Sequence, residues 1–544
     1  MTRAGSQPHQ AEENTMADHM HAPVPAEVLA GRGQPSREPV TDPTLGIPFD
    51  HPEQGQEPRH RLVTIGDSLT HGFQSGAVFN TDLSYPAIIA HELGSGTDFR
   101  FPVYPGYGGL PLNIELLLRE LQERFGKDLD WWEVPLALFH ARRFLDEVED
   151  YWERGPGSVV PQINAINHNL SVYGWDLRDV LEKSAKICQD AIASPVDDLL
   201  RQTVENNGDR AALRVLPSGS VDRGGTMTLL SAARRLGEDR PDGGGHGIET
   251  LIVFLGANNA LQTVTQLKVE WSGEGYDDLE RKKAYTVWDP GHFKDELRQI
   301  VAQVRQIAAR HVIWCTVPHV TIAPLARGIG DKSAPGSRYF PYYTRPWIDD
   351  DTFSPVLHPH LTGQEAEDVD RAVDLYNEAI TDHVRTARTA GADWLLMDTA
   401  GLLDRLASRR YIKDMTAQPP WWRPYQLPPQ LKALAPEPNS HFITSDGTGR
   451  TDGGLFSLDG VHPTTIAYGI VAQELVNVML AAGVRFRHSD GSVRTAPVTV
   501  DFDRLIRRDT LVNQPPANLD STLNILAWAQ SSLGLLKRAL YFRV

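Results

Sequence analysis

The first segment with chemical potential is TIGDSLTHGF, which runs from Thr64 to Phe73. An apolar run leads directly into Gly66, Asp67 and Ser68, and glycine permits a tight turn at the end of a strand. Proteins of the α/β class bind their ligands beyond the carboxyl ends of the strands, so this turn would expose the Ser68 hydroxyl where a substrate binds. Taken alone, the same residues are equally consistent with an ordinary turn in which serine caps a helix.

A partner for this serine lies in SLDGVHPTTIAYGIVAQELV, from Ser457 to Val476. Asp459 and His462 stand three residues apart, just ahead of a helical pattern. A serine hydroxyl is a weak nucleophile at neutral pH and needs an adjacent base, for which histidine is the usual choice. A carboxylate behind the imidazole fixes its tautomer and stabilises the imidazolium. The alternative is a surface loop in which Asp459 only caps the helix.

Two further segments offer hydrogen-bond donors at the ends of apolar runs. NLSVYGWDL places Gly174, and FLGANNAL places Asn258, directly after such a run. Acyl transfer creates an oxyanion, which the N–H groups of Gly174 and Ser68 and the Asn258 side chain would stabilise. Gly109 in PGYGGLPLN is a second candidate glycine, but it follows a stretch typical of a loop. We therefore expect Gly174, not Gly109, beside Ser68.

Five apolar runs, rich in β-branched or aromatic residues, would form the sheet that positions these groups. They begin at Arg61, Asn169, Thr250, His311 and Asp393. Helical patterns lie between them, for example LRDVLEKSAKICQDAI and FKDELRQIVAQVRQIAA. Continuous apolar strands that alternate with helices predict an α/β fold with a mainly parallel sheet.

The wide spacing of these strands predicts long insertions, since about 30 residues suffice for a strand–helix–strand unit. We place the insertions near 95–165, 195–248, 262–292, 319–370 and 405–455, and we expect most of their aromatic residues to pack onto the core. Insertions of this kind often build the substrate pocket. We expect three parts, namely a disordered tail over 1–48, an α/β domain with large insertions over 49–484 and an extension over 485–544 that packs on the core.

These blocks resemble those of the GDSL/SGNH hydrolase superfamily over about residues 58 to 484. The resemblance rests on the order and identity of four short motifs. They are GDSL around Ser68, the single glycine Gly174, GANN with Gly256 and Asn258, and Asp459-x-x-His462 followed by Pro463. The chain departs from the family at Asn259, where aspartate is common, and this position is usually a supporting one.

The resemblance implies a catalytic role for each of these residues. Ser68 would be the nucleophile, His462 its base and Asp459 the group that orients the base, while Gly174 and Asn258 donate to the oxyanion together with the Ser68 N–H. It also implies a three-layer α/β/α sandwich with a five-stranded, parallel, flavodoxin-like sheet. No cofactor and no metal are expected.

Bulk composition narrows the possible partners. The net charge of -17 makes nucleic acid an unfavourable partner, because an acidic surface repels phosphates. Cys188 and Cys315 are too few for a disulfide framework. The spacing of the histidines near the N-terminus matches no metal-ligand pattern. HPHL at His358 could ligate a metal, but its pattern favours a loop at the surface. We see neither a secretory signal nor a run able to span a bilayer, which favours a cytoplasmic protein with no stable membrane insertion.

Three functions remain open at this point. The first is hydrolysis of a small-molecule or lipid ester through an acyl-serine, and the second is acyl transfer from the same intermediate to an alcohol. The third is a non-catalytic binding protein on the same core, which the complete set of Ser68, Asn258, Asp459 and His462 disfavours. The sequence indicates neither the identity of the ester nor the oligomeric state.

Overall fold

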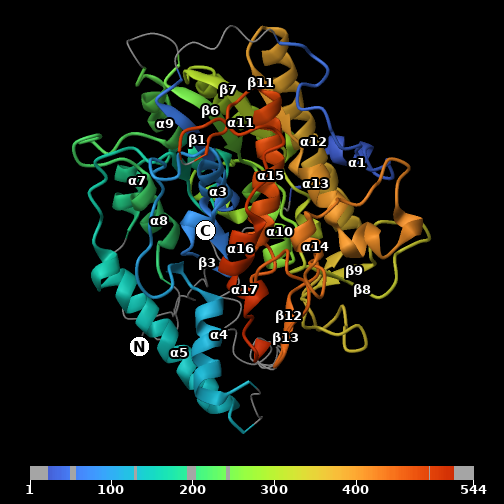
Figure 1. The fold of residues 1–544 in the computed structure, drawn as a ribbon. Helices are drawn as coiled ribbons and strands as arrows, with labels where there is room; N and C mark the ends of the chain where they lie inside the picture. The colour runs from blue at the N-terminus through green and yellow to red at the C-terminus, as the bar shows by residue number, and fades with distance from the viewer. Residues whose placement is uncertain are drawn as a thin grey trace, which may run out of the picture.

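The computed structural model describes residues 22–49, 57–127, 132–192, 204–240, 246–488 and 490–519. Its centre is a five-stranded sheet in the order β11-β7-β6-β1-β5, in which every pairing is parallel (Figure 1). The strands are β1 (His60–Gly66), β5 (Asn169–Ser171), β6 (Ile248–Phe254), β7 (Ala309–Cys315) and β11 (Trp394–Met397). All five predicted strands are therefore confirmed, and their spatial order is the flavodoxin-like one.

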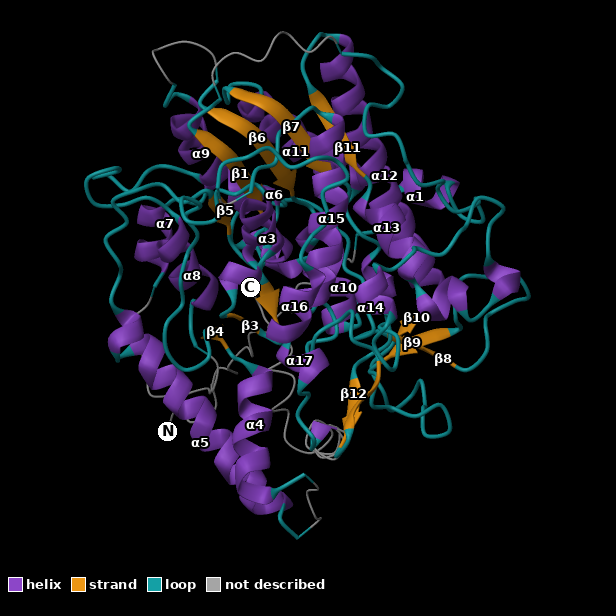
Figure 2. Ribbon diagram, in the orientation of Figure 1, coloured by secondary structure: helices purple, strands orange, loops and turns teal. Residues whose placement is uncertain are grey.

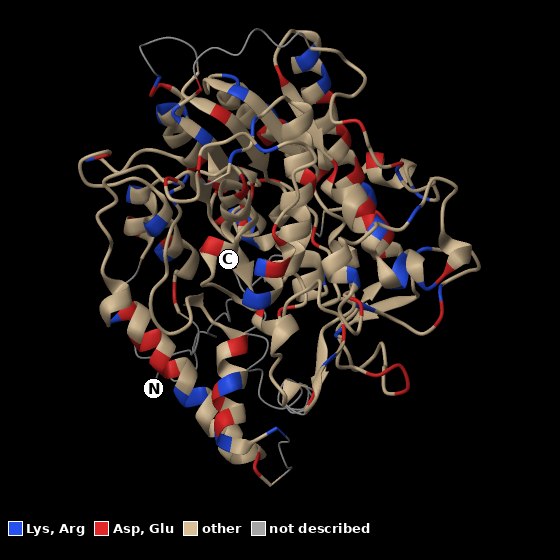
Figure 3. Cartoon of the chain, viewed as in Figure 1, with Lys and Arg blue, Asp and Glu red and all other residues tan. Residues whose placement is uncertain are grey.

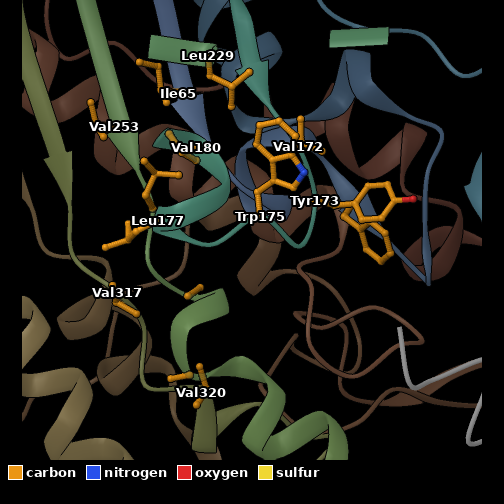
Figure 4. Packing of buried hydrophobic residues seen from close by; sticks show 14 of the residues in the cluster. Ile65, Val172, Tyr173, Trp175, Leu177, Val180, Leu229, Val253, Val317 and Val320 are labelled. Atoms are coloured by element: carbon orange, nitrogen blue, oxygen red, sulfur yellow. The ribbon is translucent and has the colours of Figure 1, made fainter. Parts of the chain in front are cut away.

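Helices cover both faces of this sheet and make three layers (Figure 2). Side chains alternate between the faces along each strand, so Val63 and Ile65 join one hydrophobic core while Leu62 joins the other. The first core is completed by α6 (Leu177–Glu182), α9 (Leu229–Gly237), α11 (Pro290–Val304) and α12 (Gly363–Thr389). The second is completed by α3 (Tyr85–Glu92), α13 (Thr399–Leu406), α15 (Thr465–Ala481) and α16 (Phe502–Arg508). Figure 4 shows part of the first core, with Ile65, Val180 and Leu229 close together.

The insertion after β1 carries the most prominent projection of the molecule. Its elements are α2 (Ser68–His71), the small sheet of β2 (Phe73–Gln74), β3 (Ala77–Val78) and β4 (Leu110–Pro111), and the helices α4 (Ile114–Phe125) and α5 (Val134–Glu153). The helices α4 and α5 form the lower end of Figure 1, and Figure 3 shows several acidic positions along α5.

The other insertions add short elements around the sheet. They contain the helices α7 (Ala185–Ala191), α8 (Asn207–Val215), α10 (Asn258–Gln266) and α14 (Pro429–Lys432). One small sheet is formed by β8 (Arg327–Ile329), β9 (Tyr342–Thr344) and β10 (Leu361–Thr362), and another by β12 (Thr444–Asp446) and β13 (Gly449–Asp452). Trp271, Trp288 and Trp422 are buried, as expected for aromatic residues that pack insertions onto the core. One predicted helix is broken, because Ser184 caps a new helix, α7, after α6 has ended.

The predicted tail over 1–48 differs from the structure for residues 22–48. This segment contains α1 (Ala26–Ala30) and lies along α12 and β11. Arg32 pairs with Asp368 at 2.7 Å, and the Leu396 N–H donates to the Pro43 carbonyl at 2.9 Å. Val28 is fully buried in the first core, and Val40 and Leu45 pack against it. Scattered apolar residues and polar contacts thus place a segment that has no hydrophobic period, which composition alone does not reveal. Residues 1–21 of the predicted tail lie outside the described residues.

The C-terminal extension packs on the core as far as it is described. Phe486, Val498, Phe502 and Leu505 are buried in the second core, and α17 (Thr510–Asn513) follows α16. The amphipathic pattern after residue 520 lies outside the described residues. Among the helices in the described ranges, none has the length and apolar character needed to cross a bilayer.

Candidate active site

Ser68 lies at the carboxyl end of β1, on the first turn of α2. The Asp67 side chain caps this helix by accepting the Leu69 N–H at 3.1 Å. Gly66 is required for this turn, because a Cβ there would lie 2.0 Å from Thr70 Oγ1 and 2.9 Å from the Phe254 carbonyl oxygen. Ser68 is only 4% exposed, so its hydroxyl faces the interior of the site and not bulk water.

His462 and Asp459 approach Ser68 from the loop that precedes α15. His462 Nε2 lies 2.8 Å from Ser68 Oγ, and His462 Nδ1 lies 3.1 Å from Asp459 Oδ2. An ionised carboxylate can only accept, so Nδ1 carries the proton and Nε2 accepts the Ser68 hydroxyl. The three groups therefore form the continuous hydrogen-bonded line that a nucleophile, a base and an orienting acid would need.

The Asp459 carboxylate is held by backbone donors on both oxygens. Its Oδ1 accepts the N–H groups of Val461 at 2.9 Å and His462 at 2.8 Å, and its Oδ2 accepts that of Gly76 at 3.0 Å. Burial raises the pKa of Asp459, but the adjacent His462 ring and these hydrogen bonds outweigh burial and hold the pKa below its usual value of 3.8. Asp459 is thus ionised and fixed in place.

Two contacts around the His462 loop are not visible in the motifs. The Phe73 ring on β2 packs against the imidazole with ring centroids 4.5 Å apart. Ser457 Oγ accepts the Ser75 N–H at 2.9 Å, which ties the Asp459 loop to the β2–β3 turn. Both contacts restrict the imidazole to the orientation that reaches Ser68, and both join segments that are far apart in the sequence.

Gly174 and Asn258 line one small cavity with Ser68 and His462, of about 50 Å³. Gly174 has a φ of +75°, which favours glycine at this position. Within the described residues, neither the Gly174 N–H nor the Ser68 N–H has another acceptor. Asn258 Nδ2 donates one hydrogen to the Trp175 carbonyl at 2.9 Å, which leaves its second hydrogen for a ligand.

Gly109 does not line this cavity. Its N–H donates to the Gly106 carbonyl at 3.0 Å, and its carbonyl accepts the Trp152 indole N–H at 2.8 Å. Of the two glycines, the structure thus places Gly174, and not Gly109, in the cavity with Ser68. Asn259, the position that departs from the family pattern, is fully buried and lines neither this cavity nor the apolar cavity described below.

His71 supports the oxyanion side of the site, a role that the sequence analysis missed. Its Nδ1 accepts the Tyr173 N–H at 3.1 Å, so its Nε2 carries the proton and donates to Tyr104 Oη at 2.8 Å. Tyr104 donates in turn to the Ala211 carbonyl at 3.0 Å. Burial lowers the pKa of His71 to about 3, which keeps the ring neutral and this chain of bonds intact. Tyr173 precedes Gly174 directly, so His71 fixes the loop that presents the Gly174 N–H.

Asp67 adds an ionisable group next to the nucleophile. Burial raises its pKa to about 7, against the lowering effects of the Leu69 N–H and of nearby His462.

An apolar cavity of about 120 Å³ opens on the other side of the nucleophile. Its walls come mainly from the segments 318–323, 399–406 and 455–471, together with Ser68. The predicted insertions supply only a minority of these residues, and most of the wall belongs to α13, to α15 and to the loop before α15. Apart from the catalytic pair, its wall is mainly aliphatic. The side chains that matter for a bound chain are Leu261, Leu402, Leu403, Leu406 and Val471.

No protein-family model matches the chain, and no curated protein matches it. The roles considered for the site therefore rest on its geometry and on the motifs of the sequence.

Replacing Asn258 tests the oxyanion side. We expect Asn258→Ala to lower kcat by about 10²–10³-fold, because one preorganised donor to the developing charge is lost. Gln262→Ala is the matched control, since Gln262 lies on the same helix and lines the same cavity without belonging to the donor set. Steady-state rates of ester hydrolysis for the two variants measure the difference. Equal rates for Asn258→Ala and the wild type would remove Asn258 from the oxyanion hole.

His319 lies in the wall of the apolar cavity and bridges two helices. Its Nε2 lies 3.1 Å from Asp374 on α12, and its Nδ1 lies 3.2 Å from Asp404 on α13. Burial lowers the pKa of His319, but the carboxylates of Asp404, Asp370 and Asp374 raise it to about 10. The buried ring is thus an imidazolium that holds the cavity wall together.

This imidazolium predicts a pH-dependent stability. An unfolded histidine loses its proton near pH 6.5 and folded His319 near pH 10, so its stabilisation is complete below 6.5 and is lost as pH rises towards 10. His319→Gln should reduce this dependence and lower the free energy of unfolding by about 3–5 kcal/mol at pH 6. Urea unfolding at pH 6 and pH 9 measures both effects. His360→Gln, which replaces a loop histidine bonded to the His358 carbonyl, should leave both nearly unchanged.

Proposed function

We propose that this protein is a serine ester hydrolase of the GDSL/SGNH type that cleaves carboxylic esters through an acyl-serine intermediate. The observation that carries the proposal is the line from Ser68 Oγ to His462 Nε2 at 2.8 Å and from His462 Nδ1 to Asp459 Oδ2 at 3.1 Å. Donors for an oxyanion lie in the same cavity. A binding protein would have no need to hold a serine, an imidazole and a carboxylate in this order.

The geometry supports a two-step mechanism. Ser68 Oγ attacks the ester carbonyl carbon while His462 Nε2 takes the hydroxyl proton, and Asp459 stabilises the resulting imidazolium. The N–H groups of Ser68 and Gly174 and the free Asn258 hydrogen stabilise the oxyanion. When the intermediate collapses, the C–O bond to the alcohol breaks and His462 gives its proton to the leaving oxygen. Water then attacks the acyl-serine with His462 again as base, which releases the acid and restores Ser68.

A fluorophosphonate probe tests the nucleophile without knowledge of the substrate. We expect the wild-type protein to form a covalent adduct that mass spectrometry of a tryptic digest locates on Ser68. Asn258→Ala should still be labelled, more slowly, because its nucleophile and base remain. A folded wild-type protein that leaves Ser68 unmodified would favour the non-catalytic alternative. Product analysis with added methanol then separates hydrolysis from acyl transfer.

The apolar cavity supports an acyl group of limited length. Its volume of about 120 Å³ is a little below the roughly 150 Å³ of a cavity that holds the six carbons of benzene. About four to six carbons of an acyl chain would therefore fit beside Ser68. The wall is mainly aliphatic, so binding energy would come from the burial of methylene groups.

A series of p-nitrophenyl esters measures this preference. We expect kcat/KM to rise by roughly fourfold for each methylene from acetate towards hexanoate, which corresponds to about 0.8 kcal/mol per buried CH₂. The gain should stop once the cavity is full. Leu403→Trp should abolish the gain with chain length while it leaves acetate hydrolysis nearly unchanged. A wild-type preference for acetate over butanoate would contradict the assignment of this cavity to the acyl chain.

A further inference from the structure

A second and larger cavity, of about 450 Å³, lies beyond the wall of the apolar cavity. The segment 320–326 separates the two, with Val320 and Ala323 facing the apolar cavity and Thr321 and Pro324 facing the larger one. Ser440 lines both cavities. The larger cavity contains none of the catalytic or oxyanion residues, and its volume lies within the range of small-molecule sites.

Basic side chains dominate the charge of this cavity. Five line it, namely Arg327, Arg338, Arg409, Arg410 and Lys413, against two carboxylates, Asp349 and Asp452. Asp349 is exposed, and Asp452 already pairs with His441 at 2.7 Å. We refer to this cavity as the basic cavity.

Carboxylates outside the lining neutralise two of the four arginines. Arg410 pairs with Asp370 at 2.8 Å, and Arg327 pairs with Asp350 at 2.7 Å. These two guanidinium groups therefore already have a counterion and are less available to a ligand.

The other two arginines, Arg338 and Arg409, have no carboxylate at ion-pair distance within the described ranges. Arg338 Nε donates to Tyr339 Oη at 2.9 Å, and Arg409 Nη2 donates to the Gly328 carbonyl at 2.9 Å. Both side chains are partly buried. Among the described residues, Arg338 Nη1 and Arg409 Nε are buried without any hydrogen-bond partner.

Burial lowers the pKa of Arg409, and the charge of Arg327 lowers it further, so this guanidinium is the less compensated of the two. Arg338 is also buried, but nearby groups that include Asp370 and Asp374 raise its pKa. An anion in the cavity would therefore gain most from the charge of Arg409 and from the buried N–H groups of both side chains.

The backbone that presents Arg409 and Arg410 is unusual. Both lie on a π-helix, Ser408–Ile412, a rare conformation that is frequent at functional sites. Ser408 N–H donates to Ser440 Oγ at 2.8 Å, and Ser440 N–H donates to Ser408 Oγ at 3.3 Å, so the π-helix is fastened to the opposite wall. Burial, with smaller effects from the positive charges of Arg410 and Arg409, lowers the pKa of nearby Lys332 to about 8.

Aromatic rings form the rest of the lining. Phe340, Tyr343, Trp347 and Phe442 line the cavity, and the Arg409 guanidinium lies 5.2 Å from the centre of the Phe340 ring. Rings next to guanidinium groups whose buried N–H donors are still available suit a ligand with a planar or apolar body and a charged end. Arginine is well matched to phosphate and carboxylate, both of which it binds in a bidentate manner.

We propose that the basic cavity is a binding site, separate from the catalytic one, for a small aromatic anion that carries a phosphate or carboxylate group. Arg338 and Arg409 bind the anionic group, and the aromatic side chains of the cavity contact the planar body. The proposal is independent of the esterase assignment, because no residue of the basic cavity takes part in the proposed chemistry.

Binding of simple probes to the full-length protein tests this proposal. Isothermal titration at constant ionic strength would use phenyl phosphate, phthalate and inorganic phosphate in separate arms. We expect one of the two aromatic anions to bind saturably and more tightly than inorganic phosphate. The anion that binds more tightly shows whether the site prefers a phosphate or a carboxylate group. Arg338→Gln and Arg409→Gln should each raise Kd at least about tenfold. Arg405→Gln, a nearby arginine that does not line the cavity, should bind as the wild type does. An unchanged Kd in both cavity variants, or no saturable binding of any probe, would overturn the proposal.

A second measurement needs no substitution. Phenylglyoxal modifies accessible guanidinium groups, and mass spectrometry identifies the modified arginines. Phenyl phosphate or phthalate should slow the modification of Arg338 and Arg409 several-fold while Arg405 reacts at an unchanged rate. Equal rates with and without both aromatic anions would count against the site even if a cavity variant failed to fold.

Discussion

Ser68→Ala should lower kcat by about a millionfold and leave the fold intact. Loss of the nucleophile in a serine hydrolase has an effect of this size, since the remaining groups act only as a unit with it. The serine hydroxyl makes its hydrogen bond to His462 Nε2, and no other buried group depends on it in the described structure. The loss of one oxygen atom at this position should therefore change the free energy of unfolding little.

Three measurements check this expectation together. Rates of hydrolysis of a p-nitrophenyl ester give the activity, circular dichroism gives the fold, and thermal unfolding gives the stability. Ser457→Ala is a useful comparison, because its hydroxyl accepts the Ser75 N–H and so acts on the site only through the loop. We expect Ser457→Ala to lose far less activity than Ser68→Ala. A folded Ser68→Ala protein with near wild-type turnover would rule out the acyl-serine mechanism.

The strand-end residues of the site could be predicted because each follows a strand with a clear apolar pattern. Ser68, Gly174 and Asn258 stand just beyond β1, β5 and β6, which are adjacent in the sheet. Parallel neighbours bring their carboxyl ends together, so the order of motifs along the chain already places these residues close in space. The spacing of Asp459 and His462 ahead of a helix made their pairing equally predictable.

Contacts between segments that have no shared pattern could not be predicted. The bond from the Tyr173 N–H to His71 and that from the Gly76 N–H to Asp459 each join two segments that lie far apart in the sequence. The sequence around His71 does not indicate which backbone N–H its ring nitrogen will accept. The basic cavity is the same case, since its arginines come from separate insertions and only the fold brings them together. Residues 22–48 differ from the prediction for a related reason, because a few scattered apolar residues such as Val28 and a set of ion pairs, rather than a hydrophobic period, hold them against the core.

His462→Ala should be nearly as damaging as Ser68→Ala, whereas Asp459→Asn should lower kcat by a smaller factor, about 10⁴-fold. The imidazole moves the proton in both steps, so its loss leaves Ser68 without a base. The amide in Asp459→Asn cannot replace the carboxylate, because one of its two positions is an NH₂ group, which cannot accept a hydrogen bond. In one orientation the NH₂ group faces the two N–H groups that Oδ1 accepts, and in the other it faces the Gly76 N–H that Oδ2 accepts. The Phe73 ring still packs against the imidazole in this variant and keeps it near Ser68.

The ranking of the two variants separates a proton-transfer role from an orienting role. Rates for both should be measured on one ester across a range of pH, together with fluorophosphonate labelling of Ser68. We expect slow labelling in Asp459→Asn and almost none in His462→Ala, because only the first keeps a base within reach of the hydroxyl. Exogenous imidazole should restore part of the activity of His462→Ala by occupying the space of the lost ring, and it should leave Asp459→Asn unaffected. A His462→Ala protein that is faster than Asp459→Asn would show that the carboxylate, and not the imidazole, activates the serine.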